Sequence, residues 1–581
     1  MLLILTSGVR VLGITFAGLS FDSFYAILLI GAIALIISLV VRRKFLFPIK
    51  PRTSDCILFA ILAIQAIIVI IYFRYYPIFP QFPSNDFMDH VLVSKDLIAG
   101  ITPKSFPAQA NTFQWSPFGI FYGGIEYQIS LALILVSGID LAISEVVMGI
   151  LVVLSSLLFY LVGEKLFKSP RAGLIIAGAY SFAGPVWFGE VFNTGLYSNF
   201  YGVLATMFFI VVMIFFVSEP RKWNYWALVI LATVNLLWSH YSSITVYPAM
   251  IVYAVAVYLN QKKNNNKLNL TLSLTPLVVP ILGAGIVALS LSHIRIVIER
   301  LFVQAGSSTV EGSTFFSSLF SGFPFLSYTA LFSSDIPFLA VLILSLAGVY
   351  FGLRRKEFSK LLVPIVWFLT LAIGSLLVSP LNQWRFSIVA LIPLTITSGY
   401  GIYTLIERYA LQGRSVEEKG KTTEQHPILV PWKAIVIIVI TLGALFIGSW
   451  GQSVLTLGVT SNPSSYSAQQ NDVYSAIMWL GNNTANGSNY LSVSDWRFEY
   501  TILFNNHSTY YNPASDLPSA ISLANYYKCS YIIVTNLMSG YPAPQYGETP
   551  WQTFPHSSAD NATLVYSNAD VEIFQVNGTS G

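Results

Sequence analysis

Charge is the scarcest feature of this sequence. Only 10% of its 581 residues are Asp, Glu, Lys or Arg, whereas 55% are hydrophobic. An ordinary soluble domain carries about 25% charged residues, so most of this chain must face lipid rather than water. This scarcity excludes a soluble enzyme, a disordered regulator and a nucleic-acid-binding protein. Cysteine is also scarce, because Cys56 and Cys529 are the only two, and they build neither a disulfide framework nor a thiolate metal site.

Long apolar runs are what the sequence has in abundance. A helix that crosses a bilayer needs about 20 apolar residues, or fewer where the membrane is thinned. With the stretch 3–20 included, the runs predict twelve or thirteen spans and a membrane domain over 1–450. The predicted spans are 23–41, 55–73, 144–163, 173–191, 199–217, 226–243, 246–259, 270–292, 337–353, 361–378, 386–406 and 432–450.

Basic residues give these spans an orientation. Of the 31 Lys and Arg residues, 22 fall in one alternating set of short loops: 42–52, 165–171, 221–222, 262–267, 354–360 and 408–433. Because cytoplasmic loops carry an excess of Lys and Arg, this set is predicted to be cytoplasmic. The opposite set of loops and the segment after residue 450 are then predicted to be external.

The segment 451–581 differs from the rest in composition. It has no spanning run, and its eight Asp and Glu residues against one Arg and one Lys give it a net charge of −6. Alternating apolar residues predict strands at 490–493, 531–535, 563–566 and 571–576, the last two as a hairpin, and helices at 472–480 and 517–527. The predicted fold class is therefore a polytopic α-helical membrane protein with a C-terminal external α/β domain.

Five Asn-x-Ser/Thr sequons also lie in this segment. Chance explains any single one in an Asn- and Ser-rich sequence, but five on the side predicted to be external favour a glycosylated outer domain. A sixth sequon, at Asn269, lies in a loop predicted to be cytoplasmic. The predicted glycosylation sites are Asn482, Asn486, Asn506, Asn561 and Asn577.

The first long external loop, 74–143, holds the densest group of ionisable residues. Asp86, Asp89 and His90 fall within five positions, and on a helix Asp86 and His90 share a face. Such a group could hold a divalent cation, such as Mg²⁺ or Mn²⁺, or act as a general base on a hydroxyl. The plainer interpretation is a helix N-cap at Asn85 or Asp86. Apolar stretches predict that the loop lies on the membrane as short interfacial helices.

Several short segments follow one another in a fixed order through residues 55–220. They are Asp86-x-x-x-His90, Ile98-Ala99-Gly100, Trp115-Ser116-Pro117-Phe118-Gly119, Tyr160-Leu161-Val162-Gly163 and Gly195-Leu196-Tyr197-Ser198-Asn199. In order and topology they resemble the GT-C superfamily of membrane glycosyltransferases, most of all the oligosaccharyltransferase catalytic subunit and the protein O-mannosyltransferases. The resemblance implies that Asp86 is the catalytic aspartate, as base or metal ligand, and that Asp89 and His90 support it.

The sequence departs from the oligosaccharyltransferase pattern at two places. Ser198 and Asn199 occupy positions where that family has metal-binding acids, and neutral oxygens bind a divalent cation more weakly. In the outer domain, Ser494–Tyr500 stands where the family has Trp-Trp-Asp-Tyr-Gly, a motif that reads the sequon hydroxyl. Trp496 and Arg497 are the candidate acceptor contacts there, with an arginine in place of the family's aspartate.

Two further residues are candidates for binding. Arg385 opens the span 386–406 from its external end, where it could grip a lipid phosphate or simply reach the headgroup layer. The resemblance implies the first role, because GT-C enzymes hold the polyprenyl phosphate with an arginine near this point. Glu311, in the external loop 293–336, resembles in position an acidic acceptor contact of oligosaccharyltransferases, although a solvated loop acid is the plainer interpretation.

Together these features predict a membrane glycosyltransferase. It would transfer sugar from a polyprenyl-phosphate-linked donor, held in the bilayer, to an external protein or glycan acceptor. Two alternatives from other classes remain. A non-catalytic GT-C relative that binds lipid-linked glycans, or serves as a subunit of a complex, would explain the loss of the acids at Ser198 and Asn199. A polytopic transporter is the other, but the sequence has few charges in the middle of its spans.

Overall fold

The computed structural model describes about half of the chain. The described residues are 52–75, 141–183, 197–218, 223–239, 241–263, 335–355, 357–377, 380–408, 465–485, 488–493, 508–511, 514–536, 554–559 and 561–577, with Val278 and Trp551 singly. They fall into two compact units, one that contains most of the helices before residue 408 and one that contains 465–577. The predicted spans 3–20, 23–41, 270–292 and 432–450 lie outside the described residues.

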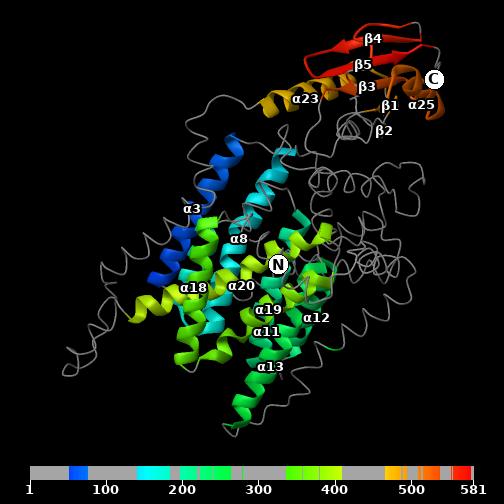
Figure 1. Ribbon diagram of the computed structural model, residues 1–581. Coiled ribbons are helices and arrows are strands. Elements are labelled where there is room, and N and C mark those ends of the chain that lie inside the picture. Colours follow the sequence, from blue (N-terminus) through cyan, green and yellow to red (C-terminus); the bar gives the residue numbers. More distant parts are fainter. Residues whose placement is uncertain are drawn as a thin grey trace. The chain divides into compact units, whose positions relative to one another are not determined.

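The first unit is built from long apolar helices (Figure 1). Six helical segments in its described part are long and apolar enough to cross a membrane, which confirms the predicted polytopic helical class. Eight of the predicted spans coincide with helices to within six residues at either end, and a ninth, 173–191, matches α9 up to residue 183, beyond which it lies outside the described residues. The elements are α3 (Thr53–Tyr75), α8 (Leu141–Phe167), α9 (Pro170–Ala183), α11 (Tyr197–Ser218), α12 (Trp223–Ser239), the 3₁₀ turn η3 (Tyr241–Thr245), α13 (Val246–Lys263), α18 (Asp335–Arg354), α19 (Phe358–Leu377) and α20 (Pro380–Ile406).

Helix α20 is the central helix of this unit. It contacts α9, α18 and α19, and nearly all of its side chains from Phe386 onward are buried. Glycines allow the close approach. A Cβ on Gly401 would clash with the backbone carbonyl of Leu344 in α18, and one on Gly399 would lie 2.6 Å from Cγ1 of Ile176 in α9. Small residues at helix contacts are how membrane helices gain packing energy without a hydrophobic driving force.

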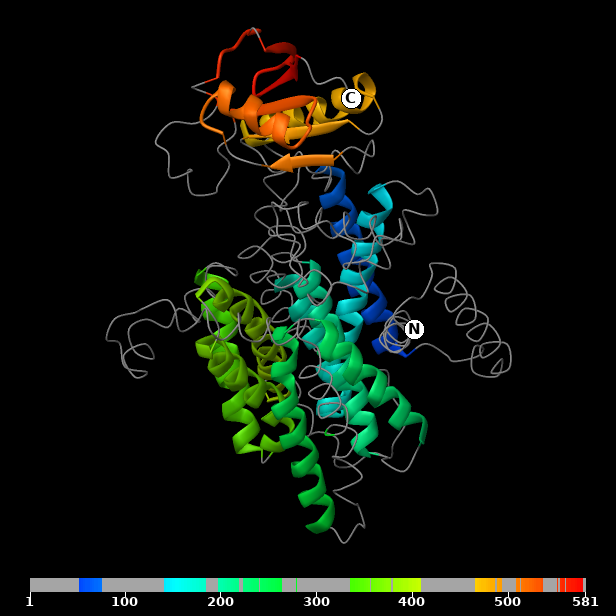
Figure 2. The same ribbon diagram turned by 90° about the vertical axis from the view of Figure 1, so that its right-hand side faces the viewer.

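Helices α3, α8 and α9 form a second packed group, with α3 and α8 side by side in both views (Figure 2). Leu58 of α3 packs against Tyr160 of α8 and against Leu174 and Ala177 of α9. The chain reverses between α8 and α9 in two residues. Lys168 makes that turn with φ of 54°, in the left-handed region that costs a side-chain-bearing residue roughly 1–2 kcal/mol.

The second unit is an α/β domain around a five-stranded sheet. The strands are β1 (Asn489–Ser492), β2 (Ser508–Tyr511), β3 (Tyr531–Thr535), β4 (Ala562–Ser567) and β5 (Val571–Val576), in the order β2-β1-β3-β5-β4. Strand β1 is parallel to β2 and β3, whereas β5 is antiparallel to both β3 and β4. This confirms the predicted α/β domain and its hairpin. Strand β2, a four-residue edge strand, was not predicted from the sequence.

One helix packs on each face of this sheet. Helix α23 (Ser465–Asn483) buries Val473, Ala476, Ile477 and Leu480, at helical spacing, against Ile533 and Ile573. Helix α25 (Leu517–Tyr526) covers the other face, and the Asp516 side chain caps it by accepting from the backbone N–H of Ser519 at 2.8 Å. Each such Leu or Ile removed from water contributes about 1.5–3 kcal/mol. The domain therefore has a core of its own on both faces of the sheet.

Candidate functional site

Arg385 is the one predicted catalytic or binding residue of the membrane domain that the structure describes. It lies near the beginning of α20, at the end predicted to be external. The residue is partly exposed, whereas Phe386 and the residues after it are buried. The Phe386 ring packs against Gly374 of α19. The approach is so close that a Cβ on that glycine would lie 2.9 Å from Cε1 of the ring. The guanidinium is thus carried by a helix end that packing holds in place.

The turn η3 packs against the same end of α19 and α20. The Thr245 hydroxyl donates to the Ser242 carbonyl at 2.5 Å and accepts from Nε1 of Trp367 at 3.2 Å. The Thr245 carbonyl accepts from the hydroxyl of Thr370 at 2.6 Å, and its methyl group lies near Gly374. Residues far apart in sequence are therefore joined by neutral hydrogen bonds beside the beginning of α20.

Asn199 completes this neutral cluster from α11. Its side chain is buried, and Oδ1 accepts a hydrogen bond from the Ser242 hydroxyl at 3.3 Å. For a divalent cation this is a poor fit, because the described donors at this position are neutral and the Asn199 oxygen already has a hydrogen-bond donor. Among the described residues, no group of three or more His, Cys, Asp or Glu could hold a metal ion. Asp86, the predicted metal ligand, lies outside the described residues.

Most of the other predicted site residues also lie outside the described part of the chain. This applies to Asp86, Asp89, His90, Glu311, Trp496 and Arg497. Their predicted roles stay predictions. The structure does bring Asn199 and the beginning of α20 to one end of the helical unit, through η3.

Three of the five predicted glycosylation sites are described, and all three asparagines are exposed: Asn482, Asn561 and Asn577. The sequon hydroxyls are engaged in the folded domain. Thr484 donates to the Leu480 carbonyl at 2.5 Å, and Thr563 donates to Oδ1 of Asn577 at 3.1 Å. Asn486 and Asn506 lie outside the described residues.

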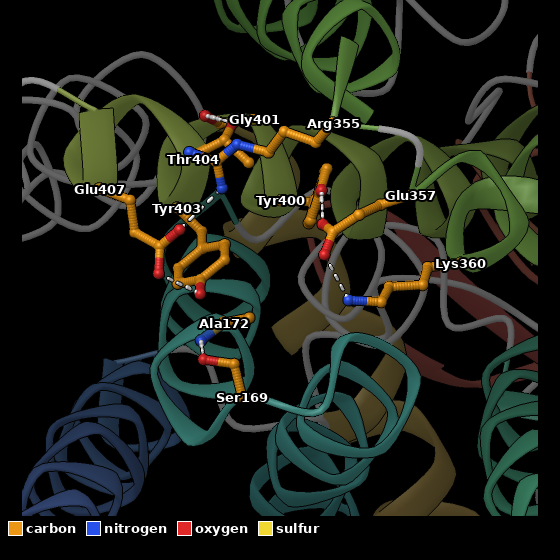
Figure 3. Close-up of polar contacts among 10 residues, drawn as sticks. All are labelled: Ser169, Ala172, Arg355, Glu357, Lys360, Tyr400, Gly401, Tyr403, Thr404 and Glu407. Atoms are coloured by element: carbon orange, nitrogen blue, oxygen red, sulfur yellow. Dashed lines mark hydrogen bonds and ion pairs between the residues drawn. The ribbon is translucent and has the colours of Figure 1, made fainter. Parts of the chain in front are cut away.

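A denser polar network lies at the opposite end of α20, the end predicted to be cytoplasmic (Figure 3). Arg355, after α18, pairs with Glu407 just beyond α20 at 2.7 Å. Glu357, before α19, accepts from Lys360 at 2.7 Å and from the Tyr400 hydroxyl at 2.5 Å. Burial alone would raise the pKa of Glu357, but the hydrogen bonds from Lys360 and Tyr400 outweigh it and hold the pKa below its usual value.

Tyr403 extends the network toward α8 and α9. Its hydroxyl donates to Glu407, and it is also hydrogen-bonded to Ser169 in the turn between those helices. The ring of Phe167 stacks on Tyr400 with centroids 4.4 Å apart. Each carboxylate in the network pairs with a basic residue and accepts a hydrogen bond from a tyrosine. The network therefore joins three helix ends and leaves neither carboxylate unpaired for a ligand.

This network could not be predicted from the sequence, because the residues that pair in it are distant in sequence. The only local signal is the spacing Tyr400-x-x-Tyr403-x-x-x-Glu407, which places three polar groups on one side of a helix end. Nothing in that spacing identifies Arg355 or Ser169 as partners.

The buried Cys529 of the α/β domain is not a candidate nucleophile. Burial raises the pKa of its thiol to about 12, so the thiol stays uncharged at neutral pH.

The fold is that of a polytopic membrane protein with an α/β domain. No known protein family and no curated protein matches the sequence. Similar solved structures include the archaeal oligosaccharyltransferase AglB from Archaeoglobus fulgidus in complex with an inhibitory peptide and a dolichol-phosphate, at 14% identity and a TM-score of 0.46. An apo form of an oligosaccharyltransferase from the same organism has 14% identity and a TM-score of 0.47, and for both the match covers 82% of this chain and 69% of theirs.

A third similar structure is ArnT from Cupriavidus metallidurans bound to undecaprenyl phosphate. It has 12% identity and a TM-score of 0.48, and the match covers 89% of this chain and 98% of ArnT. AglB and ArnT are GT-C glycosyltransferases, the class that the sequence resembles. At this identity and these TM-scores the likeness carries no argument about activity, which has to rest on the chain's own residues.

Proposed function

We propose that this protein is a GT-C-type membrane glycosyltransferase that transfers sugar from a polyprenyl-phosphate-linked donor to an external protein or glycan acceptor. The observation that carries the proposal is Arg385. A partly exposed guanidinium at the beginning of a buried central helix is well placed to hold a phosphate at the membrane boundary. Arginine suits this task because it stays charged and can donate two parallel hydrogen bonds to phosphate.

The remaining roles in the proposal come from the sequence. Asp86 would accept the proton of the attacking acceptor group, or hold a Mg²⁺ or Mn²⁺ ion, with Asp89 and His90 supporting it. Glu311, Trp496 and Arg497 would contact the acceptor. We further propose that Asp86 and Arg385 flank one cavity, because a lipid-linked phosphate cannot leave the bilayer and a polar acceptor cannot enter it.

Donor binding by Arg385 variants tests the proposal. With the protein in lipid nanodiscs, Arg385→Ala should weaken binding of a polyprenyl-phosphate probe by tenfold or more, because the phosphate loses its counter-charge at a partly buried site. Arg385→Lys should retain part of the affinity, since it keeps the charge and loses the paired geometry. Arg354→Ala is the matched control, because Arg354 is exposed at the opposite end of the unit.

Equal probe affinity in the wild type and Arg385→Ala would overturn the donor-binding role. If the probe binds only through Arg385 and no sugar transfer occurs with any acceptor, the non-catalytic alternative is favoured. That alternative has its own support in Asn199, a buried neutral residue where the oligosaccharyltransferases have an acid. The transporter alternative has less support, because charged residues in the described spans lie toward the helix ends.

The proposal also requires the outer domain and the Arg385 end of α20 to be external. Glycan mapping by mass spectrometry of protein from its native host should then find sugar on some of Asn482, Asn486, Asn506, Asn561 and Asn577. Asn269 should carry none, because its loop belongs to the basic set. Sugar on Asn269 would reverse the orientation and place Arg385 on the wrong side for an external acceptor.

A further inference from the structure

The outer domain contains a carboxylate–imidazole pair that the proposed transfer reaction does not use. Nδ1 of His556 lies 3.0 Å from Oε1 of Glu572 in β5. The two partners differ in exposure, because the Glu572 side chain is 6% exposed and that of His556 is 53% exposed. The pair therefore combines a buried carboxylate with an imidazole that reaches solvent.

Glu572 is unusual for its place in the sheet. Its cross-strand partner in β3 is Val534, and the next residue of β5 on the same face is Phe574; both belong to the apolar core beneath α25. Among the described residues, Oε2 of Glu572 is buried and has no hydrogen-bond partner. Burying a carboxylate in this way costs stability, and a hydrophobic residue of similar size is often as good or better for folding. A purely structural role therefore explains Glu572 poorly.

The carboxylate does fix the imidazole. An ionised Glu572 can only accept a hydrogen bond, so Nδ1 of His556 must carry the proton, which leaves Nε2 as an acceptor. The result is a rigid acceptor atom on a half-exposed ring, suited to a ligand that brings a hydroxyl donor.

An aromatic surface lies beside this acceptor. The Trp551 ring is 5.1 Å from the His556 ring, at an interplanar angle of 55°. Trp551 is partly exposed and packs against the same core, in which Phe554 is buried. The indole is thus held at the edge of the core with part of its surface in solvent. An indole beside a hydroxyl acceptor matches a sugar ring, which has an apolar C–H face and polar hydroxyl edges.

We propose that Trp551 and His556 form a sugar-binding subsite of the outer domain, with Glu572 as the residue that positions His556. The subsite would bind one pyranose ring, which stacks on the indole and donates a hydroxyl hydrogen bond to Nε2. The inference concerns binding only and does not depend on transferase activity. It extends the proposed function by giving the outer domain a role in retaining a glycan.

Saturation-transfer NMR on the full chain in nanodiscs tests the subsite. The probes are N,N′-diacetylchitobiose and methyl α-mannopyranoside, used separately at millimolar concentration. At least one of them should receive saturation on its ring protons, and Trp551→Ala and His556→Ala should each reduce that signal at least fivefold. Tyr526→Ala is the matched control, because Tyr526 is a 76% exposed aromatic residue of the same domain. It should leave the signal unchanged.

Substitutions of Glu572 separate positioning from a structural role. Glu572→Leu should keep or raise the unfolding temperature and still weaken probe binding about fivefold, because it leaves His556 unoriented. Glu572→Gln should restore part of the binding, since its amide oxygen can still accept from Nδ1. Two results would overturn the proposal: no saturation transfer to either probe in the wild type, or unchanged signals in folded Trp551→Ala and His556→Ala. Neither outcome bears on donor binding at Arg385, so the two proposals fail separately.

Discussion

The two ends of α20 carry different chemistry. At the end predicted to be external, Arg385 stands beside a cluster of neutral hydrogen bonds that includes Asn199 and Thr245. At the other end, Glu407 pairs with Arg355 and accepts from Tyr403. At the second end the polar groups pair with one another, so they stabilise the contact between helices. The first end carries the partly exposed Arg385, whose guanidinium has the charge and geometry to bind a phosphate, so we consider it the better candidate for function.

The largest effect is expected from Asp86→Asn, in the loop predicted to be external. If Asp86 acts as the general base, sugar transfer should fall about a hundred- to ten-thousand-fold. Binding of the polyprenyl-phosphate probe should stay close to that of the wild type, because the amide keeps the shape of the side chain. Transfer of radiolabelled sugar and probe binding, measured on the same preparation, check both halves. Unchanged transfer would show that the catalytic residue lies elsewhere.

A large structural effect is expected at the contact between α18 and α20. Gly401→Ala places a methyl group against the Leu344 carbonyl, so α18 and α20 must move apart. Overpacking of this kind costs about 1–3 kcal/mol, which should appear as a lower unfolding temperature in nanodiscs. Ile343→Ala is the control, because Ile343 is 56% exposed on α18 and faces away from the core. Equal stability of the two variants would mean that the two backbones do not approach closely.

A smaller effect is expected at the end of α20 that is predicted to be cytoplasmic. The Arg355 and Glu407 side chains are 32% and 30% exposed, so solvent screens their ion pair. A double-mutant cycle with Arg355→Gln and Glu407→Gln should give a coupling energy of about 0.2–1 kcal/mol. Probe binding at Arg385 should not change in any of these variants. A tenfold loss of probe affinity would show that the two ends of α20 are coupled and not independent.

The smallest effect is a dependence of stability on pH. Because the pKa of Glu357 is lowered in the folded protein, its ionised form contributes stability above the pKa of the unfolded chain, near 4.3. That contribution is present at pH 7 and is lost as the pH falls through the folded pKa. The difference in unfolding temperature between the wild type and Glu357→Gln should therefore shrink between pH 7 and pH 3. A constant difference would contradict the lowered pKa.

The sequence predicted what depends on local pattern. Apolar runs located α3 and α20 to within a few residues, and alternation with a polar turn located the β4–β5 hairpin. It could not predict contacts that depend on distant partners. The Glu407–Arg355 pair crosses 52 positions, and Glu572 meets His556 only because the domain folds its chain back. Strand β2 was missed because four residues at a sheet edge carry too little alternation to be distinguished from a loop.

In the candidate site, too, local signals could be predicted from the sequence and contacts between distant residues could not. Arg385 could be chosen from the sequence because a lone cation that opens an apolar run is a local signal. The contact of Asn199 with Ser242 could not, since it depends on η3 folding back between α12 and α13. The sequence identified Asn199 only as a departure from a family pattern. The structure adds that the residue is buried and already hydrogen-bonded, which is a physical reason for a neutral side chain there.

The order of strands in the outer domain has a consequence for how the protein is made. Strand β5 is the last of the five in sequence, yet it lies in the interior of the sheet between β3 and β4. The five-stranded sheet therefore cannot be completed until residues 571–576 have been synthesised. Until then β4 has no partner in β5, and the Thr563 hydroxyl lacks the hydrogen bond that it donates to Asn577 in the folded domain. A modifying enzyme has this interval, before β5 inserts, in which to read the Asn561 sequon.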